Sequence, residues 1–564
     1  MPRIATRGAA RQAATAFLLT AALLAAMAGC THGGATSKPY NALSRADFNR
    51  LAVRQDLPLY WIADSNHDKA VEPGEIAGLL FYPTAPAWTS GGSFTPAFRR
   101  AYADLVSMSK ASITDPRLAL VAQELDQGAP TLVRSDLSGL STADKAFVRD
   151  MMRIGNMIDV LYDKTTGAAA LASRVPADPL SQSLYRRNRG PTCQASTTSD
   201  KPGCSAVPGA PKLAPDAYPA ELERQKDYCA ALQKRPDAEQ LLSPFTVVRG
   251  SGSNLKAVPY TVVYKQDMTA IADELDVAAS AEQDSTEAPL VAYLRAAATS
   301  FRTNNWEPAD EAWSKMNAQN SKWYLRVGPD ETLTDPCSAK ATFHFNLARI
   351  NQSSVEWQTR LTPVRQDMEN ALAGLSGAGY HPRKVSFHLP DFIDIIVNTG
   401  DDRFGLGVVT GESLPNWGAV ADEGRGRTVV MANVTSDPDS LAARRSQAAS
   451  LLDSASMSDL VDSPKPDLFS NVLHEATHNL GPLYGYTVNG RTSEAVFGGP
   501  LSSMLEELKA QTGAIYYIEF LRAHGLIDDK LAAQTYADSI VWALGQAANG
   551  PAADDADPYA QLAG

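Results

Sequence analysis

Apolar residues recur every three or four positions over long parts of this chain, which is the spacing of amphipathic helices. The pattern is clearest in Ala146–Leu161 and extends over residues 95–180 and 220–300. Residues 187–219 follow no period and predict a long irregular segment. Short runs rich in β-branched and aromatic residues predict strands, at Tyr260–Tyr264, Lys340–Phe345, Phe392–Val397 and Arg427–Met431. We therefore expect an α+β protein that is mostly helical, with its strands in the middle of the chain.

The segment Asn471–Pro482 carries His474, Glu475 and His478 in the spacing HExxH. Residues four apart project from one face of a helix, so the two histidines can present imidazole nitrogens to one Zn²⁺, with Glu475 turned toward the open side of the metal. A chance match explains the string poorly, because the chain has only 8 histidines among 564 residues. We expect a zinc helix with Glu475 as the catalytic base.

A later helix, predicted from apolar spacing between residues 500 and 521, offers the third ligand. Glu506 and Glu507 lie near its start. A carboxylate ligand is normally held by a second polar group, and Gln511 lies four residues after Glu507, whereas Ala510 lies four after Glu506. We expect Glu507 to be the ligand. The alternative is that both glutamates only complement the dipole of the helix.

Together, HEATHNLGP and LEELKAQTG resemble the two motifs of the dipeptidyl peptidase III family of zinc peptidases, in its branch with a five-residue HExxH. Gly411–Asn416 resembles the family's substrate loop, Gly-x-Asn-x-Pro-Asn, and Val327–Pro336 its segment ending in Glu-x-x-x-Asp-Pro. The resemblance runs from about residue 323 to the C-terminus. It implies two lobes, a strand-containing one facing a helical zinc lobe, with an extended peptide between them.

The same resemblance implies that Zn²⁺ binds His474, His478 and Glu507, and that the enzyme cleaves short peptides from the amino-terminal end. It places Asn416 and Ser413 in the substrate site, where Ser413 replaces the family's first Asn.

Other departures weaken the match. Gln511 replaces an acid, and Arg326 stands where better-known members have a tyrosine that steadies the tetrahedral intermediate. Tyr324 takes that place only if the strand is shifted by two residues. The family's later transition-state histidine has no counterpart, because His524 lies about 25 Å along the helix from Glu507. We expect normal zinc binding and slow turnover.

Two alternatives to an active peptidase stay open. One is a zinc-binding lipoprotein that is weakly active or inactive and captures peptides. The other is a Ca²⁺-dependent surface protein with structural zinc. This second alternative is disfavoured, because structural zinc sites have four protein ligands and only three are evident.

The N-terminus has the three-part shape of an export signal. Arg3, Arg7 and Arg11 precede an apolar run, and Met27–Cys30 resembles a bacterial lipobox. We expect residues 1–29 to be a lipoprotein signal peptide, Cys30 to be lipidated and residues 30–43 to be a tether. Thr31 is not the residue that usually retains such proteins in an inner membrane, so we expect an outer-membrane anchor facing the periplasm. Plain secretion is the alternative.

Beyond the tether we expect three regions: a mainly helical region at 44–225, a strand-containing lobe with the substrate loop at 226–435, and a helical zinc-binding lobe at 436–564. The first contains a segment that resembles an EF-hand loop, with Asp64, Asn66, Asp68 and Glu75 as candidate Ca²⁺ ligands. Lys69 replaces the usual glycine of that loop. Calcium binding and a metal-free relic are equally open.

The net charge of −12 gives no indication of nucleic-acid binding. After Cys30, four cysteines remain, an even number that predicts two disulfides in an oxidising compartment. Three pairings are possible. The pairing of Cys193 with Cys204, which staples a short loop, leaves Cys229 with Cys337.

Overall fold

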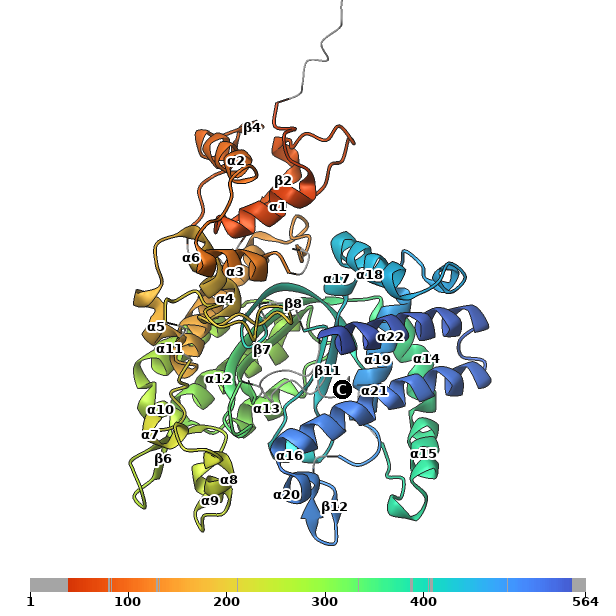
Figure 1. Ribbon diagram of the computed structural model, residues 1–564. Coiled ribbons are helices and arrows are strands. Elements are labelled where there is room, and N and C mark those ends of the chain that lie inside the picture. The colour runs from red at the N-terminus through yellow and green to blue at the C-terminus, as the bar shows by residue number, and fades with distance from the viewer. Residues whose placement is uncertain are drawn as a thin grey trace, which may run out of the picture.

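The computed structural model describes residues 39–549, apart from 80–81, 83, 128–129, 131, 210, 212, 333, 386–388, 404, 406–408 and 484. The expected signal peptide and Cys30 lie outside these residues. Figure 1 shows a small N-terminal module above two larger parts, a lobe built around a sheet and a lobe built from helices. No helix within the described residues is long and apolar enough to cross a membrane.

The N-terminal module comprises residues 39–110 and has its own apolar core, in which Phe48, Trp61 and Phe98 are almost fully buried. Ser44 begins its first helix by accepting a hydrogen bond from the backbone N–H of Asp47, the expected role of an N-cap serine. Its elements are α1 (Arg45–Arg54), β1 (Leu59–Trp61), β2 (Ile76–Gly78), β3 (Thr89–Ser90), β4 (Ser93–Phe94) and α2 (Pro96–Met108).

The sheet lobe contains a five-stranded sheet in the order β10-β11-β9-β8-β7. The neighbours β11 and β9 are parallel, and the other pairs are antiparallel. Alternation along β11 divides its side chains between two cores, with Val429 and Met431 in one and Val430 in the other. The strands are β7 (Trp323–Glu331), β8 (Thr342–Asn351), β9 (Asp391–Gly400), β10 (Gly411–Leu414) and β11 (Arg427–Met431).

Helices from two separate stretches of the chain share one core with the sheet. They are α4 (Thr142–Thr165), α11 (Lys265–Ala281), α12 (Ala288–Thr303) and α13 (Glu307–Trp313). Shorter elements surround them: α3 (Pro116–Leu125), α5 (Ala168–Leu171), α6 (Pro179–Asn188), α7 (Ala220–Glu223), α8 (Tyr228–Gln233), α9 (Ala238–Leu241), β5 (Thr246–Arg249), β6 (Lys256–Pro259), α10 (Tyr260–Val263), α16 (Gly418–Asp422) and α17 (Ala432–Thr435).

The helical lobe packs around the zinc-motif helix. Its core joins this helix to the long helix that follows, to two earlier helices and to one face of the sheet through Phe392 and Val430. The elements are α14 (Ser354–Leu361), α15 (Arg365–Ser376), α18 (Pro438–Leu451), α19 (Lys465–His478), β12 (Thr487–Val488), β13 (Arg491–Thr492), α20 (Ser493–Phe497), α21 (Gly499–Ala523) and α22 (Asp529–Asn549). The expected class, α+β with a strand-containing lobe facing a helical lobe, is confirmed.

The strand predicted at Tyr260–Tyr264 is wrong, because residues Tyr260–Val263 form helix α10. Tyr260 and Tyr264 are buried, whereas Val262 between them is 63% exposed, which is the burial period of a helical turn. Pro259 precedes the turn and ends β6. Of the other three predicted runs, Phe392–Val397 lies in β9 and Arg427–Met431 is β11, whereas Lys340–Phe345 overlaps β8, which begins at Thr342.

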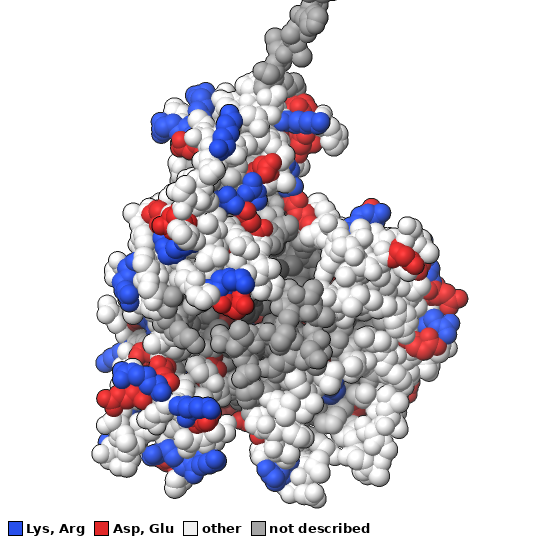
Figure 2. All heavy atoms as spheres, in the orientation of Figure 1, with Lys and Arg blue, Asp and Glu red and all other residues white. Residues whose placement is uncertain are grey.

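Both predicted disulfides are confirmed. Cys193 pairs with Cys204 and Cys229 with Cys337. On the face drawn in Figure 2, basic and acidic side chains lie next to one another over the N-terminal module and the sheet lobe.

Candidate functional site

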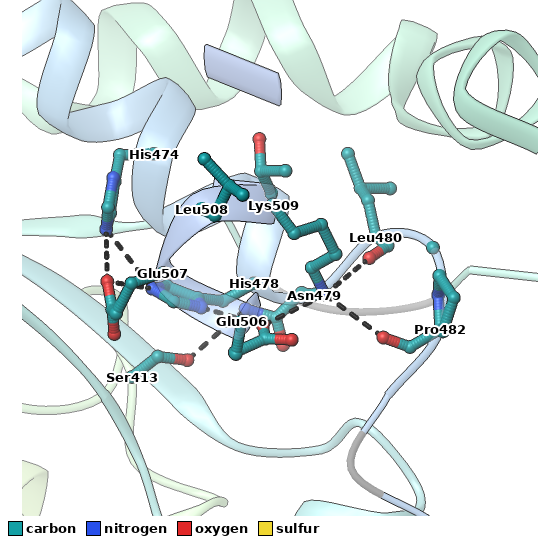
Figure 3. Close-up of polar contacts among 12 residues, drawn as sticks. Ser413, His474, His478, Asn479, Leu480, Pro482, Glu506, Glu507, Leu508 and Lys509 are labelled. Carbon is teal, nitrogen blue, oxygen red and sulfur yellow. Dashed lines mark hydrogen bonds and ion pairs between the residues drawn. The ribbon is translucent and has the colours of Figure 1, made fainter. Parts of the chain in front are cut away.

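The two motif histidines meet a glutamate from the next long helix. The apolar side of α19 buries Phe469, Val472 and Leu473, which leaves His474 and His478 on another side, facing α21. His474 Nε2 lies 3.2 Å from His478 Nε2 and 3.3 Å from Glu507 Oε2. His478 Nε2 lies 3.8 Å from the same oxygen. Figure 3 shows the three side chains converging, and their donor atoms all lie within 4.8 Å of one another.

The outer nitrogens of both rings are held by α21. His474 Nδ1 lies 3.0 Å from Gln511 Oε1, and His478 Nδ1 lies 2.9 Å from Glu506 Oε1. Both partners are acceptors, so each Nδ1 donates a hydrogen bond to α21, and Nε2 is the ring nitrogen that each histidine would offer to a metal. Lys509 donates to Glu506 at 2.9 Å and to the carbonyl oxygen of Pro482 at 3.0 Å, which anchors Glu506 (Figure 3).

Gln511 makes a different contact from the one predicted for it. Gln511 was expected to hold the carboxylate of Glu507, but its amide oxygen contacts His474 instead. Gln511 lies one helical turn beyond Glu507 on α21, and this position faces His474 on α19. Glu507 still converges with the histidines, whereas Glu506 supports His478.

The donor set fits a zinc ion. Two imidazoles and one carboxylate converge, and three protein ligands with a fourth position left for water or substrate characterise catalytic zinc. Burial opposes protonation of His478, but the facing carboxylates of Glu507 and Glu506 raise its pKa to about 9. The pocket therefore favours a positive charge at this point. A divalent cation would supply that charge by displacing the proton.

Glu475 lies beside this group without belonging to it. Its side chain is 7% exposed, and Oε2 has no hydrogen-bond partner among the described residues. Burial raises its pKa; His478 and His474 oppose the rise, and Glu507 and Glu412 add to it. Strand β10 passes so close that a Cβ on Gly411 would lie 2.5 Å from Glu475 Oε1. The carboxylate is thus confined next to the edge of the sheet.

The predicted substrate loop runs along that edge. Its first four residues form β10, an edge strand of the five-stranded sheet. Ser413 Oγ lies 3.0 Å from Thr428 Oγ1, and Asn479, directly after the zinc helix, donates to Thr428 at 3.0 Å. At the other end of the loop, Asn416 Nδ2 donates to the carbonyl oxygen of Asp330 at 3.1 Å. The loop therefore connects the zinc helix with the end of β7.

Three residues are candidates for stabilising an oxyanion, and they differ in the contacts that they make. Arg326 is buried and ion-paired with Asp330 and, at 2.8 Å, with Asp310. His524 follows the last residue of α21, and its Nδ1 contacts the carbonyl oxygen of Phe520 at 2.7 Å. Tyr324 donates its hydroxyl hydrogen bond to Glu412, the neighbour of Gly411. Of the three, Tyr324 has the shortest chain of contacts to Glu475.

The EF-hand-like loop joins two antiparallel strands, β1 and β2, rather than two helices. Asp64 accepts a hydrogen bond from the N–H of Lys69 at 3.0 Å, and Lys69 has φ +63°, the left-handed conformation for which EF-hands use glycine. Glu75 accepts from the N–H of Ser65 at 2.7 Å. Asp64, Asp68 and Glu75 do not form a mutually close donor group within the part of the chain that the structure describes. Calcium binding by this loop, with Asn66, stays a prediction.

Sequence reasoning did not assign roles to Gly411, Glu412, Glu506 and Lys509. The pair Glu506–Lys509 carried a signal, since opposite charges three apart on a helix form ion pairs. Gly411 and Glu412 gave none, because their importance arises from the approach of β10 to α19.

Comparison with known proteins gives a likeness in structure only. No family model matches the sequence, and no curated protein matches it. Dipeptidyl-peptidase III from Corallococcus sp. strain EGB superposes with a TM-score of 0.66 at 23% identity, covering 79% of this chain and 81% of that one. DPP III from Caldithrix abyssi gives 0.62 at 20% identity, covering 78% and 82%. At these identities the likeness establishes the fold: the chain has the fold of dipeptidyl-peptidase III.

Proposed function

We propose that this protein is a zinc-dependent peptidase that cleaves short peptides from their amino-terminal end. The observation that carries the proposal is the convergence of His474, His478 and Glu507 beside the free carboxylate oxygen of Glu475. The fold of dipeptidyl-peptidase III supports it. Zn²⁺ bound by the three residues supplies Lewis acidity, which polarises a carbonyl group and makes a water molecule more acidic.

The protein's own residues have distinct tasks in this reaction. Glu475 takes the proton from the attacking water and returns it to the leaving amine. Gln511 and Glu506 keep the two imidazoles oriented. Strand β10 offers backbone N–H and C=O groups at the sheet edge to an extended peptide, the arrangement called β-augmentation. Asn416 and Ser413 lie on this loop and would hold the amino-terminal part of the substrate.

The test is hydrolysis of a fluorogenic dipeptidyl substrate by the zinc-loaded full chain, with the same substrate acetylated at its amino group as the control. We expect the free substrate to be cleaved and the acetylated one to resist. Equal cleavage of both would contradict recognition of the amino terminus. If zinc is bound at His474, His478 and Glu507 and neither substrate is cleaved at any peptide length, the alternative of a peptide-binding protein is favoured instead.

We further propose that Cys30 anchors the protein as an outer-membrane lipoprotein facing the periplasm, with residues 1–29 removed. The support is the sequence Met27–Cys30 after an apolar run. Replacing Cys30 by Ala should release the protein from the membrane fraction of the producing cell. Retention of that variant in the membrane fraction would contradict lipidation.

A further inference from the structure

A second group of metal-type donors lies inside the sheet lobe. His344 belongs to β8, and Asp401 and Asp402 follow β9; all three are buried, and their donor atoms lie within 4.8 Å of one another. His344 Nδ1 is 3.3 Å from Asp401 Oδ1 and 3.9 Å from Asp402 Oδ1. These separations are close to those between the donors of the candidate zinc centre, which are 3.2, 3.3 and 3.8 Å.

These buried atoms are close to one another but do not satisfy one another. Among the described residues, neither ring nitrogen of His344 has a hydrogen-bond partner of acceptable geometry, nor have Asp401 Oδ1 and Asp402 Oδ2. Asn346, fully buried two residues further on the same face of β8, also has both amide atoms without a partner. Buried polar atoms are nearly always paired, so this concentration of unpaired ones indicates a missing ligand.

Neighbouring side chains orient His344 and Asp401 by contacts that are typical of metal ligands. His344 Nε2 faces Asp330 Oδ2 at 3.4 Å, and Asp330 is in turn fixed by Arg326. Metal-binding histidines commonly direct their second nitrogen at a carboxylate in this way. The other oxygen of Asp401 accepts a hydrogen bond from Thr342. Nδ1 of His344 and Oδ1 of Asp401 are therefore left 3.3 Å apart without a hydrogen bond of acceptable geometry.

The charges of His344, Asp401 and Asp402 also favour binding of a cation. Arg326 is already paired with Asp330 and Asp310, and within the described residues the ion pairs of Asp401 and Asp402 are those with His344. Burial raises the pKa of both aspartates; burial opposes protonation of His344, but Asp402, Asp401 and Asp330 raise its pKa. With both carboxylates ionised, one imidazolium leaves one negative charge uncompensated, and the carboxylates of Glu412 and Glu331 add to the negative field at Asp402. A divalent cation with a neutral imidazole leaves no net charge.

We propose that His344, Asp401 and Asp402 bind a divalent transition-metal cation inside the sheet lobe, separate from the zinc centre. One imidazole and two carboxylates suit Zn²⁺ or Mn²⁺. The cation links the middle of the sheet to the start of the segment that leads into β10. Asp402 Oδ2 has no hydrogen-bond partner among the described residues, so this carboxylate can bind through both oxygens and supply a fourth ligand atom. With four protein ligand atoms, all buried, the role of the cation is structural: it fixes the sheet lobe behind the substrate strand.

Metal content tests the proposal independently of activity. The full chain is produced with Zn²⁺, dialysed against a chelating resin and analysed by mass spectrometry for zinc per chain. We expect two zinc ions in the parent chain and one in the His474→Ala/His478→Ala variant. Adding His344→Gln or Asp401→Asn/Asp402→Asn to that variant should remove the remaining ion. Asp64→Asn/Asp68→Asn, in the EF-hand-like loop, is the matched control and should leave one.

A folded His474→Ala/His478→Ala chain that retains neither Zn²⁺ nor, when produced with it, Mn²⁺ would overturn the proposal. Circular dichroism checks that each variant is folded. If the His344 and aspartate variants fail to fold, anomalous diffraction from crystals of the His474→Ala/His478→Ala chain decides. A peak between His344 Nδ1 and the two aspartates supports the site, and a peak elsewhere, or none, refutes it.

Discussion

The carboxylates of Glu475 and Glu507 differ in what surrounds them, although they lie in the same pocket. Glu507 contacts both histidines, at 3.3 and 3.8 Å. Glu475 projects from the turn between those histidines toward β10, and its Oε2 is unpartnered among the described residues. This difference supports the proposal that Glu507 binds the metal and Glu475 exchanges a proton. Position on the helix, rather than residue type, separates the two roles.

Replacing Glu475 by Gln tests this division. The amide keeps the shape of the side chain but cannot act as a base, so we expect zinc content to be unchanged and kcat to fall roughly 10²- to 10⁴-fold. Glu519→Gln, an exposed carboxylate on α21, is the control and should leave kcat unchanged. Hydrolysis of a dipeptidyl substrate and zinc analysis of the same samples check both. A Glu475→Gln enzyme with parental kcat would refute the assigned base.

At the residue level, the relative directions of side chains could be predicted from the sequence where the contacts are local. His474, Glu475 and His478 lie within one helical turn and a half, so spacing alone defines their relative directions. Glu507 needed the packing of α21 on α19, and the reason given for it concerned a contact that Gln511 makes with His474. Gly411 and Glu412 could not be found, because the approach of a distant strand gives them their role.

At the level of elements, the site depends on how closely β10 approaches α19. Gly411 allows the approach, since a Cβ there would lie 2.5 Å from Oε1 and 3.0 Å from Cδ of Glu475. Any larger residue has to push the carboxylate away. The strand's hydrogen bonds to β11 keep it from moving instead.

Gly411→Ala should therefore displace Glu475, the proposed catalytic base, without removing the metal. A misplacement of about 1 Å commonly costs about 10²-fold in rate, and we expect a loss of roughly that size in kcat with unchanged zinc content. Gly374→Ala is the matched control, because a Cβ at Gly374 meets no atom within 4 Å. Steady-state kinetics of both variants decide the matter. Equal activities would show that Glu475 adapts to the added methyl group.

The two disulfides tie elements over very different lengths of chain, 11 residues for Cys193–Cys204 and 108 for Cys229–Cys337. A longer loop loses more entropy in the unfolded chain when it is closed. Replacing both cysteines of the longer bridge by Ser should cost about 4 to 5 kcal/mol of unfolding free energy, against about 3 kcal/mol for the shorter one. Thermal unfolding of the two double variants measures the difference. A larger loss for the short bridge would show that local packing outweighs loop entropy.

Elements in which apolar residues recur at one regular spacing could be predicted from the sequence. Elements that depend on tertiary packing could not. The apolar spacing of the later zinc helix predicted α21 well, yet Leu501, Leu508 and Ile515 within it are 37–40% exposed. Composition misassigned α10, because Val and Tyr favour strands while the burial there follows a helical turn. In the single helical turn at Tyr260, the burial of Tyr260 and Tyr264 therefore outweighs the strand propensity of these residues.

At the scale of the whole molecule, the cores do not follow the order of the chain. Helix α4, from the predicted N-terminal region, packs into the sheet core. Helices α14 and α15, from the predicted strand region, pack into the core of the helical lobe. Sequence patterns show which residues are buried but not which distant segment covers them. The predicted boundaries at 225 and 435 stay predictions about the chain.

The N-terminal module contacts both lobes. Arg54 pairs with Asp126 after α3, on the side of the sheet lobe, and Arg45 binds Asp439 in the first turn of α18, in the helical lobe. The second contact is bidentate, with N–O distances of 2.7 and 2.6 Å, and the hydroxyl of Tyr60 lies 2.7 Å from the same carboxylate. Both side chains of the ion pair are about three-quarters buried. Asp439 therefore links the N-terminal module to the helical lobe through Arg45 and Tyr60.

Asp439→Ala should loosen this connection, because it leaves the partly buried guanidinium of Arg45 without its carboxylate. Hydrogen bonds to charged groups contribute about 1.5 to 3 kcal/mol, so we expect the opening free energy of α1 and of the first turn of α18 to fall by about that amount. Amide hydrogen exchange followed by mass spectrometry measures it segment by segment. Asp273→Ala, which removes an exposed partner of Arg302 at 2.7 Å, is the control and should change exchange by less than about 1 kcal/mol. If both variants exchange alike, the module is held by its apolar contacts, and the Arg45–Asp439 pair has no share in joining it to the helical lobe.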